Sequence, residues 1–88
     1  MKPLNYAMLK HFTKVEEASV NDVMDALKNE YGHFKAFTHD ALTSAIMTAE
    51  ANGLLEETRF ELNPEKELVV YYRAHEEGAA TINYYIQD

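Results

Sequence analysis

The hydrophobic pattern of this chain changes its period at Leu54, and this change limits the folds that the chain can adopt. Before Leu54, apolar residues recur at the three- and four-residue spacing of a helix face. From Leu54 to Arg73, the pattern follows the two-residue period of strands on both sides of a turn at Asn63 and Pro64. After Glu76 the helical spacing returns. The pattern predicts an α+β fold, mainly α, with three helices, a two-stranded β-hairpin and a C-terminal helix. These elements are expected near residues 3–12, 20–31, 38–53, 54–73 and 76–86.

The second and third helices have the clearest end signals. Ser19 is an N-cap candidate, and Asp22, three residues further on, completes a capping box. Gly32 fits a left-handed stop after the second helix. Thr38 and Gly53 fit the start and the end of the third. The buried face of the third helix is expected to consist of Leu42, Ala45, Ile46 and Ala49.

The two strands of the hairpin have different patterns. The first is expected to have one face in water, because it alternates between two sets of side chains. These sets are Leu54, Thr58, Phe60 and Leu62 on one face, and Glu57, Arg59 and Glu61 on the other. The second strand, residues 68–73, is apolar on both faces, so we expect both of its faces to be covered.

Length and composition restrict the class of protein. With 88 residues, the chain is expected to form a single domain, residues 1–88, with one modest core. The chain contains no Cys, which excludes disulfides, thiolate catalysis and cysteine-based zinc sites. No segment has the pattern of a signal peptide or a membrane span. We therefore expect a cytoplasmic protein without a cofactor and without contact with a membrane.

The charge is unevenly distributed. The formal net charge is −7. Residues 1–37 hold five Lys and five acids, whereas residues 38–88 hold three basic residues and ten acids. The hairpin is especially acidic, with Glu56, Glu57, Glu61, Glu65 and Glu67. These carboxylates either keep an exposed hairpin soluble and free of other strands, or form an acidic surface for a protein partner.

Three segments resemble the winged-helix form of the helix-turn-helix. ASVNDVMDAL resembles the second helix of that motif, and AEANGLLEE resembles the end of the third helix, where the chain enters the hairpin, or wing. VVYYRAHEEG is similar to the second wing strand and the following helix in small bacterial regulators of the PadR and MarR kind, although His75 stands where a Thr cap is usual. The resemblance implies a winged helix-turn-helix with a possible short strand at Ala18.

The resemblance also implies which residues would meet DNA. The third helix would enter the major groove, where its outward positions include Met47 but no Arg or Lys. The possible DNA contacts are Lys28, Lys35, His39, Thr43, Ser44 and Thr48. Duplex binding draws much of its free energy from Lys and Arg that neutralise phosphates, so the acidic wing disfavours DNA.

The C-terminal residues suggest a dimer. In the similar regulators, the second wing strand and the terminal helix often build a dimer, and Tyr is a preferred interface residue. The possible dimer or partner interface consists of Tyr71, Ile82, Tyr84, Tyr85 and Ile86. The alternative is that these aromatic rings only cover a thin core from outside.

Two functions therefore remain open. The first is a non-enzymatic winged-helix regulatory module that acts mainly through protein contacts, as a homodimer. The second is a sequence-specific repressor that binds double-stranded DNA. Catalytic and metal sites are not expected, because the four His have no ligand spacing and there is no glycine-rich phosphate loop. The sequence does not assign a role to the loop of residues 32–37.

Overall fold

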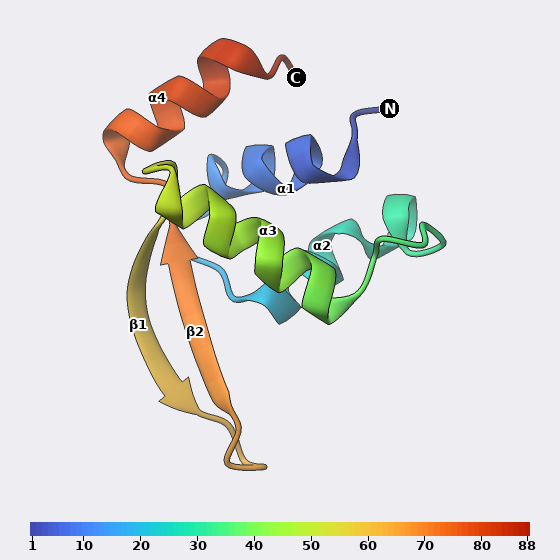
Figure 1. Ribbon diagram of the computed structural model, residues 1–88, viewed down its shortest axis with the longest axis vertical. Coiled ribbons are helices and arrows are strands. Elements are labelled where there is room, and N and C mark those ends of the chain that lie inside the picture. The colour runs from blue at the N-terminus through green and yellow to red at the C-terminus, as the bar shows by residue number, and fades with distance from the viewer.

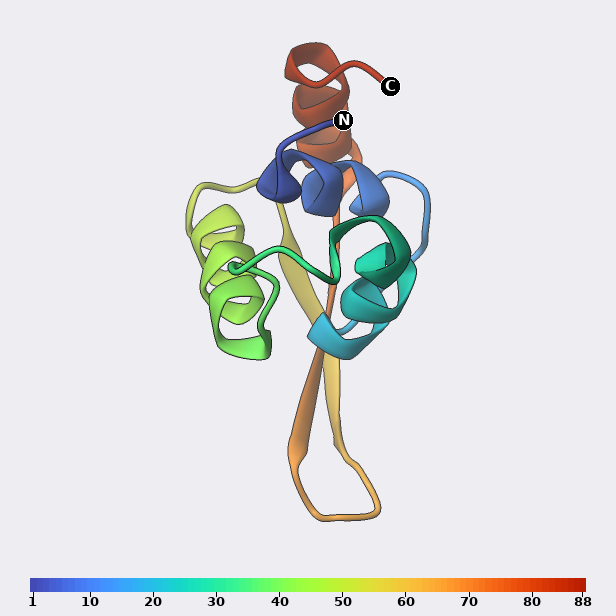
Figure 2. The same ribbon diagram turned by 90° about the vertical axis from the view of Figure 1, so that its right-hand side faces the viewer.

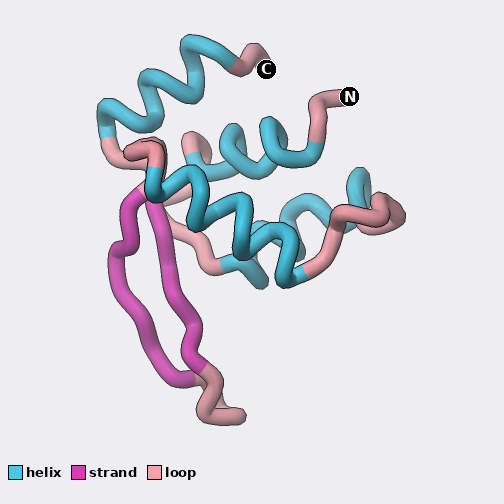
Figure 3. The backbone as a smooth tube through the Cα atoms, viewed as in Figure 1, coloured by secondary structure: helices cyan, strands magenta, loops and turns pink.

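The computed structural model describes residues 1–88 and has the predicted order of elements (Figure 1). Three helices are followed by an antiparallel hairpin and a fourth helix, as the tube in Figure 3 also shows. The elements are α1 (Leu4–Phe12), α2 (Val20–Tyr31), α3 (His39–Ala51), β1 (Glu56–Leu62), β2 (Leu68–Arg73) and α4 (Glu76–Tyr85). None of the helices is long and apolar enough to cross a membrane.

The predicted helix caps are confirmed, with one correction. The Ser19 side chain accepts a hydrogen bond from the Asp22 amide, and the Asp22 carboxylate accepts one from the Ser19 amide. Thr38 caps α3, and Gly53 follows that helix with a φ of 78°. Gly32 is not a left-handed stop, because its φ is −58°. A Cβ at this position would crowd the carbonyl oxygen of Lys28, which explains the glycine.

The helices surround one hydrophobic core, and the wing extends away from it. In Figures 1 and 2, α1, α2 and α3 form the helical body, α4 lies at one end and the wing projects from the other. The base of the wing is attached to the body by a β-bridge between Ala18 and Tyr72, at the position of the predicted short strand. The core comprises Leu4, Met8, Phe12, Ala18, Val20, Val23, Tyr31, Leu42, Ile46, Ala49, Leu55, Tyr72, Ile82 and Ile86.

The wing is much more exposed than its sequence indicated. Every residue of β1 beyond Glu56 is exposed, and so is Leu68 at the far end of β2. The expectation that both faces of the second strand are covered is therefore wrong at its far end, where Leu68 is exposed, whereas Val69 and Val70 are half-buried. The reason is geometric: the hairpin projects past the helices, so only the part near its base, at Tyr72 and Val70, reaches the core.

Candidate nucleic-acid interface

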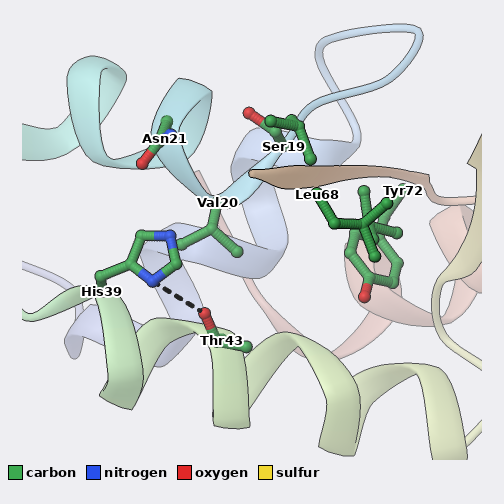
Figure 4. Close-up of a pocket in the computed structure, with 9 residues that line it drawn as sticks. Ser19, Val20, Asn21, His39, Thr43, Leu68 and Tyr72 are labelled. Atoms are coloured by element: carbon green, nitrogen blue, oxygen red, sulfur yellow. Dashed lines mark hydrogen bonds between the residues drawn. The ribbon is translucent and has the colours of Figure 1, made fainter. Parts of the chain in front are cut away.

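A hollow lies where the first turns of α2 and α3 meet β2 (Figure 4). Its volume is about 120 Å³. His39 and Thr43 of α3 form one wall, with the Thr43 hydroxyl 3.4 Å from Nδ1 of His39. The capped start of α2 and the inner side of β2 form the other walls. The full lining is Ser19, Val20, Asn21, His39, Thr43, Leu68, Val69, Val70 and Tyr72.

The exposed face of α3 combines polar and apolar residues and contains no Lys or Arg. Asp40, Ser44, Met47 and Ala51 are all exposed and lie at the four- and three-residue spacing of one helix face. Asp40, in the first turn of α3, lies on this outward face. An anionic group here repels phosphates and can accept only a base donor such as the cytosine amino group.

The six residues named as possible DNA contacts do not form one surface. His39 and Thr43 lie side by side in the hollow, and Ser44 is exposed next to them. Thr48 lines a different hollow, which α3 shares with α1. Lys28 is in the last turn of α2, far along the helix from its first turn at the hollow, and its Nζ lies 3.5 Å from Oδ1 of Asp25.

Lys35 belongs to the loop that leads into α3, where it is exposed and forms no ion pair. It is therefore free to meet a phosphate beside that helix. Sequence reasoning missed Asn21, which is exposed at the start of α2 and lines the hollow. Its position in the first turn of the second helix of the motif is the signal that could have identified it.

Most of the basic side chains are already engaged in ion pairs within the molecule. Five of the eight Lys and Arg residues form ion pairs, so only three remain unpaired. The paired residues are Lys10, Lys14, Lys28, Arg59 and Arg73. The unpaired residues are Lys2 before α1, Lys35 in the loop before α3, and Lys66 at the tip of the wing. Only the last two lie on the side of α3 and the wing.

Arg59 is held on the outer face of the wing by two carboxylates. Its Nη2 lies 2.8 Å from Oε2 of Glu17, and its Nη1 lies 3.1 Å from Oε2 of Glu61. The guanidinium also covers the ring of Tyr71 at 3.8 Å from the centroid. The Tyr71 hydroxyl donates to Oε1 of Glu61 at 2.9 Å. This group attaches the wing to the segment before α2 and removes Arg59 from the cations available to DNA.

The same contacts shift the pKa values of their members. The hydrogen bond from Arg59, with a second from Thr58, holds the pKa of Glu17 below its usual value. The hydrogen bond to Glu61 raises the pKa of the Tyr71 phenol. Both shifts are consequences of these hydrogen bonds, and their direction keeps Glu17 charged and the Tyr71 phenol protonated at neutral pH, as the bonds require.

The inner face of the wing is apolar. Phe60 is paired with Val70, and Leu62 with Leu68, across the hairpin. Residues two apart on a strand share a face, so these four side chains form one strip on the face that also carries Tyr72. Phe60, Leu62 and Leu68 are 65%, 66% and 62% exposed. This strip ends at the hollow beside α3, because Leu68 and Val70 contribute to both.

The structure places the residues proposed for a dimer interface in three different environments. Ile82 and Ile86 are buried in the core of the chain itself, so their assignment to an interface is corrected. Tyr71 lies on the outer face of the wing, engaged with Arg59. Tyr84 and Tyr85 are 76% and 75% exposed on α4, with ring centroids 4.9 Å apart. An interface through α4 would therefore rest on these two rings.

The His, Asp and Glu side chains do not gather into a metal site: no three of them lie close enough together to hold an ion. His75 has a structural position instead. Its Nδ1 accepts a hydrogen bond from the Gly78 amide, so it caps α4 in place of the usual Thr. Burial lowers the pKa of His11, which lies on α1 away from the wing.

The fold has a counterpart among solved structures. The chain is similar to PadR of Bacillus subtilis, whose structure was solved in complex with operator DNA. The superposition has a TM-score of 0.75 at 21% sequence identity, and it covers 97% of this chain and 47% of that chain. The chain thus has a winged-helix fold and spans about half the length of the PadR chain. No family model and no curated protein matches the sequence.

Proposed function

We propose that this chain is a winged-helix transcription regulator that binds double-stranded DNA through α3. The observation that carries the proposal is the similarity, over 97% of the chain, to a PadR solved on its operator. This reverses the order of preference that the charge pattern suggested. The acidic composition argues for weak electrostatic attraction, whereas a complete helix-turn-helix with a wing supplies the shape that enters a major groove.

In this function, the α3 wall of the hollow reads bases. Thr43 and His39 offer a hydroxyl and a ring nitrogen beside the exposed first turn of α2, where Asn21 is also available. Asn can form two hydrogen bonds with adenine, and Thr can contact the thymine methyl group or a base edge. Ser44 extends this set along the outward face of α3. Specificity would therefore come from short neutral side chains.

Phosphate contacts would come from Lys35 and Lys66, the unpaired cations on this side of the molecule. A dimer would present four such cations. The affinity would then fall with salt concentration with a logarithmic slope of about −3.6, which is shallow for a DNA-binding protein. Shallow salt dependence together with sequence preference is the signature that we expect.

The dimer is proposed through α4. Tyr84 and Tyr85 leave two large exposed rings on a helix whose other face is already packed on α1. Tyr brings a large apolar area with a polar tip, which suits an interface between two copies. Light scattering across micromolar concentrations should give the mass of a dimer for the native chain and of a monomer for Tyr84→Ser/Tyr85→Ser. A monomer at every concentration would remove the dimer from this proposal.

The DNA function is tested by selecting duplexes from a random library at low salt. An enriched motif is expected, and its affinity can then be measured by fluorescence anisotropy at several salt concentrations. Lys35→Ala/Lys66→Ala should weaken binding to all duplexes and flatten the salt slope. Lys2→Ala is the matched control, because it also removes an unpaired Lys but lies at the N-terminus, remote from the wing (Figure 1).

Thr43→Val separates the recognition of bases from the binding of phosphates. It removes the hydroxyl and keeps the shape, so the preference for the selected motif should fall while the salt slope stays the same. If no motif is enriched, or if Lys35→Ala/Lys66→Ala binds as the native chain does, α3 and the wing are not the DNA-binding surface.

A further inference from the structure

The inner face of the wing is the part of the molecule that DNA binding explains least. Phe60, Leu62 and Leu68 are each more than half exposed, although they are among the largest apolar side chains of the hairpin. Single exposed apolar residues are ordinary on a protein surface. Here three of them share one face, with the half-buried Val70 completing the strip. A contiguous apolar strip of this kind marks a surface that another molecule covers.

The strip is bounded by negative charge at both ends. A bulge between Glu57 and Arg59 corrects the predicted alternation and places Glu57 opposite Tyr72, at the base of the inner face. Glu65 and Glu67 lie in and beside the turn at the tip. Neither Glu57 nor Glu65 has an ion-pair partner. Arg59, the basic residue within β1, is turned to the outer face and engaged by Glu17 and Glu61. The only unpaired cation of the wing is Lys66.

This combination of charge and hydrophobicity selects among the possible occupants. A nucleic acid would bring phosphates against Glu57 and Glu65, and it would gain little from Phe60 and Leu62. A second copy of the wing would bring an equal set of carboxylates against the first, since like charges across an interface oppose association. A protein segment with Lys or Arg on either side of an apolar stripe satisfies both features.

We infer that the inner face of the wing is a docking surface for a basic amphipathic segment of another protein. The apolar stripe of that segment would cover Phe60, Leu62 and Leu68, and its cations would meet Glu57 at one end and Glu65 with Glu67 at the other. An amphipathic helix laid against an apolar surface is a common mode of recognition of this type. The inference goes beyond the proposed DNA binding and does not depend on it.

The experiment uses the full chain, labelled with nitrogen-15, and three short peptides. The first repeats Leu at helical spacing with Lys at the other positions, which gives a basic amphipathic helix. The second has Glu in place of each Lys. The third has the composition of the first in an order without an apolar stripe. The first peptide should shift the amide resonances of Phe60, Leu62 and Leu68, and the other two should bind at least about tenfold more weakly.

Two variants test the two components of the surface separately. Phe60→Thr/Leu62→Thr/Leu68→Thr introduces residues that are suited to strands. It should lower the affinity for the basic peptide at least about tenfold, because burial of apolar area drives this binding. Tyr6→Thr, which removes an exposed aromatic ring from α1, should leave the affinity unchanged. Glu57→Lys/Glu65→Lys leaves the apolar strip intact and should reverse the preference, so that the acidic peptide binds more tightly than the basic one.

Several results would overturn the inference. One is that shifts from the basic peptide map outside the wing, and another is that the three peptides bind alike. If the amide resonances of the strip shifted with the concentration of the protein in the absence of peptide, the occupant would be a second copy of the chain. If duplex DNA shifted the amide resonances of Phe60, Leu62 and Leu68 and bound as tightly as the basic peptide or more tightly, the strip would be a nucleic-acid surface. Glu57→Lys/Glu65→Lys still tests whether charge selects the peptide, even if the triple Thr variant does not fold.

Discussion

Lys10 of α1 and Asn83 of α4 join the terminal helix to the helical body. Nζ of Lys10 donates a hydrogen bond of 2.7 Å to Oδ1 of Asn83, although Lys10 as a whole is only 6% exposed. Oδ1 of Asp88 lies 3.4 Å from the same ammonium group. The charge is therefore buried beside its partners, while Ile82 and Ile86 fix the apolar side of α4. This polar contact and the apolar one together hold α4, and with it Tyr84 and Tyr85, on the helical body.

Replacing Lys10 should distinguish its charge from its shape. Lys10→Met keeps the apolar stem and removes a buried ammonium, and its partners Asn83 and Asp88 are exposed enough to be hydrated instead, so the free energy of unfolding should change by less than about 1 kcal/mol. Lys10→Glu buries a carboxylate close to Asp88 and should lower the free energy of unfolding by about 3 kcal/mol. Urea denaturation followed by circular dichroism measures both. Lys14→Glu, at an exposed position that also pairs with Asp88, is the control and should cost less than about 1 kcal/mol.

Asp88 should make the stability of the chain depend on pH in the acid range. Lys10, followed by Lys14, holds the pKa of the Asp88 carboxyl below its usual value. A carboxyl with a lowered pKa in the folded state stabilises that state at pH values above the unfolded pKa, and this contribution disappears as the pH falls through the folded pKa. Asp88→Asn should therefore unfold at a lower urea concentration than the native chain at pH 7. The difference should shrink as the pH falls below the ordinary range of an Asp carboxyl and through the lowered folded pKa, and a difference that persisted in strong acid would contradict the ion pair.

His75 should contribute two hydrogen bonds at the start of α4. Its Nδ1 accepts from the Gly78 amide at 3.2 Å, so Nε2 carries the proton and donates to the Gly53 carbonyl at 3.0 Å. His75→Ala removes the cap and the link to the end of α3, and should cost about 2 kcal/mol. His75→Thr restores the cap alone and should cost about 1 kcal/mol. Equal costs for the two variants, measured by thermal or urea unfolding, would show that the cap does not contribute.

Releasing Arg59 should strengthen DNA binding, if α3 and the wing meet DNA as proposed. Glu17 accepts hydrogen bonds from Arg59 at 2.9 Å and from Thr58 at 2.8 Å. Glu17→Gln removes one of the two carboxylates that hold Arg59, so the guanidinium is then paired with Glu61 alone and can turn toward a phosphate. The affinity for the selected duplex should rise and the salt slope should steepen by about 1 per protomer. Glu16→Gln, which makes the same change at an exposed neighbouring position, is the control. An equal rise for both variants would indicate a general effect of net charge.

The order of elements followed from local patterns. Ser19 with Asp22, Thr38 and Gly53 mark helix ends through interactions with backbone groups only a few residues away, and those interactions are the same in any tertiary arrangement. The third helix buries Leu42, Ile46 and Ala49 as its spacing indicated. Gly32 shows the limit of such reasoning, because its conformation depends on the close approach of the Lys28 carbonyl.

The candidate site was only partly predictable. Sequence spacing placed His39, Thr43 and Ser44 on an accessible side of α3, and the structure has them there. It did not separate Thr48 from them, because residues on the edges of a helix face are divided by the elements that pack on either side. The sequence also gives no sign that Arg59 is engaged in an ion pair, because its partner Glu17 lies far away along the chain.

The sequence by itself determined the helices, the hairpin, their order and the acidic sign of the wing, since these depend on neighbouring residues and on composition. The tertiary structure alone decided which apolar side chains are covered and which cations are free. Ile82 and Leu68 have similar hydrophobicity, yet Ile82 lies in the core and Leu68 is 62% exposed. The reason is that burial and ion pairing depend on which distant segments meet. The hairpin projects beyond the helices, whereas α4 packs on α1.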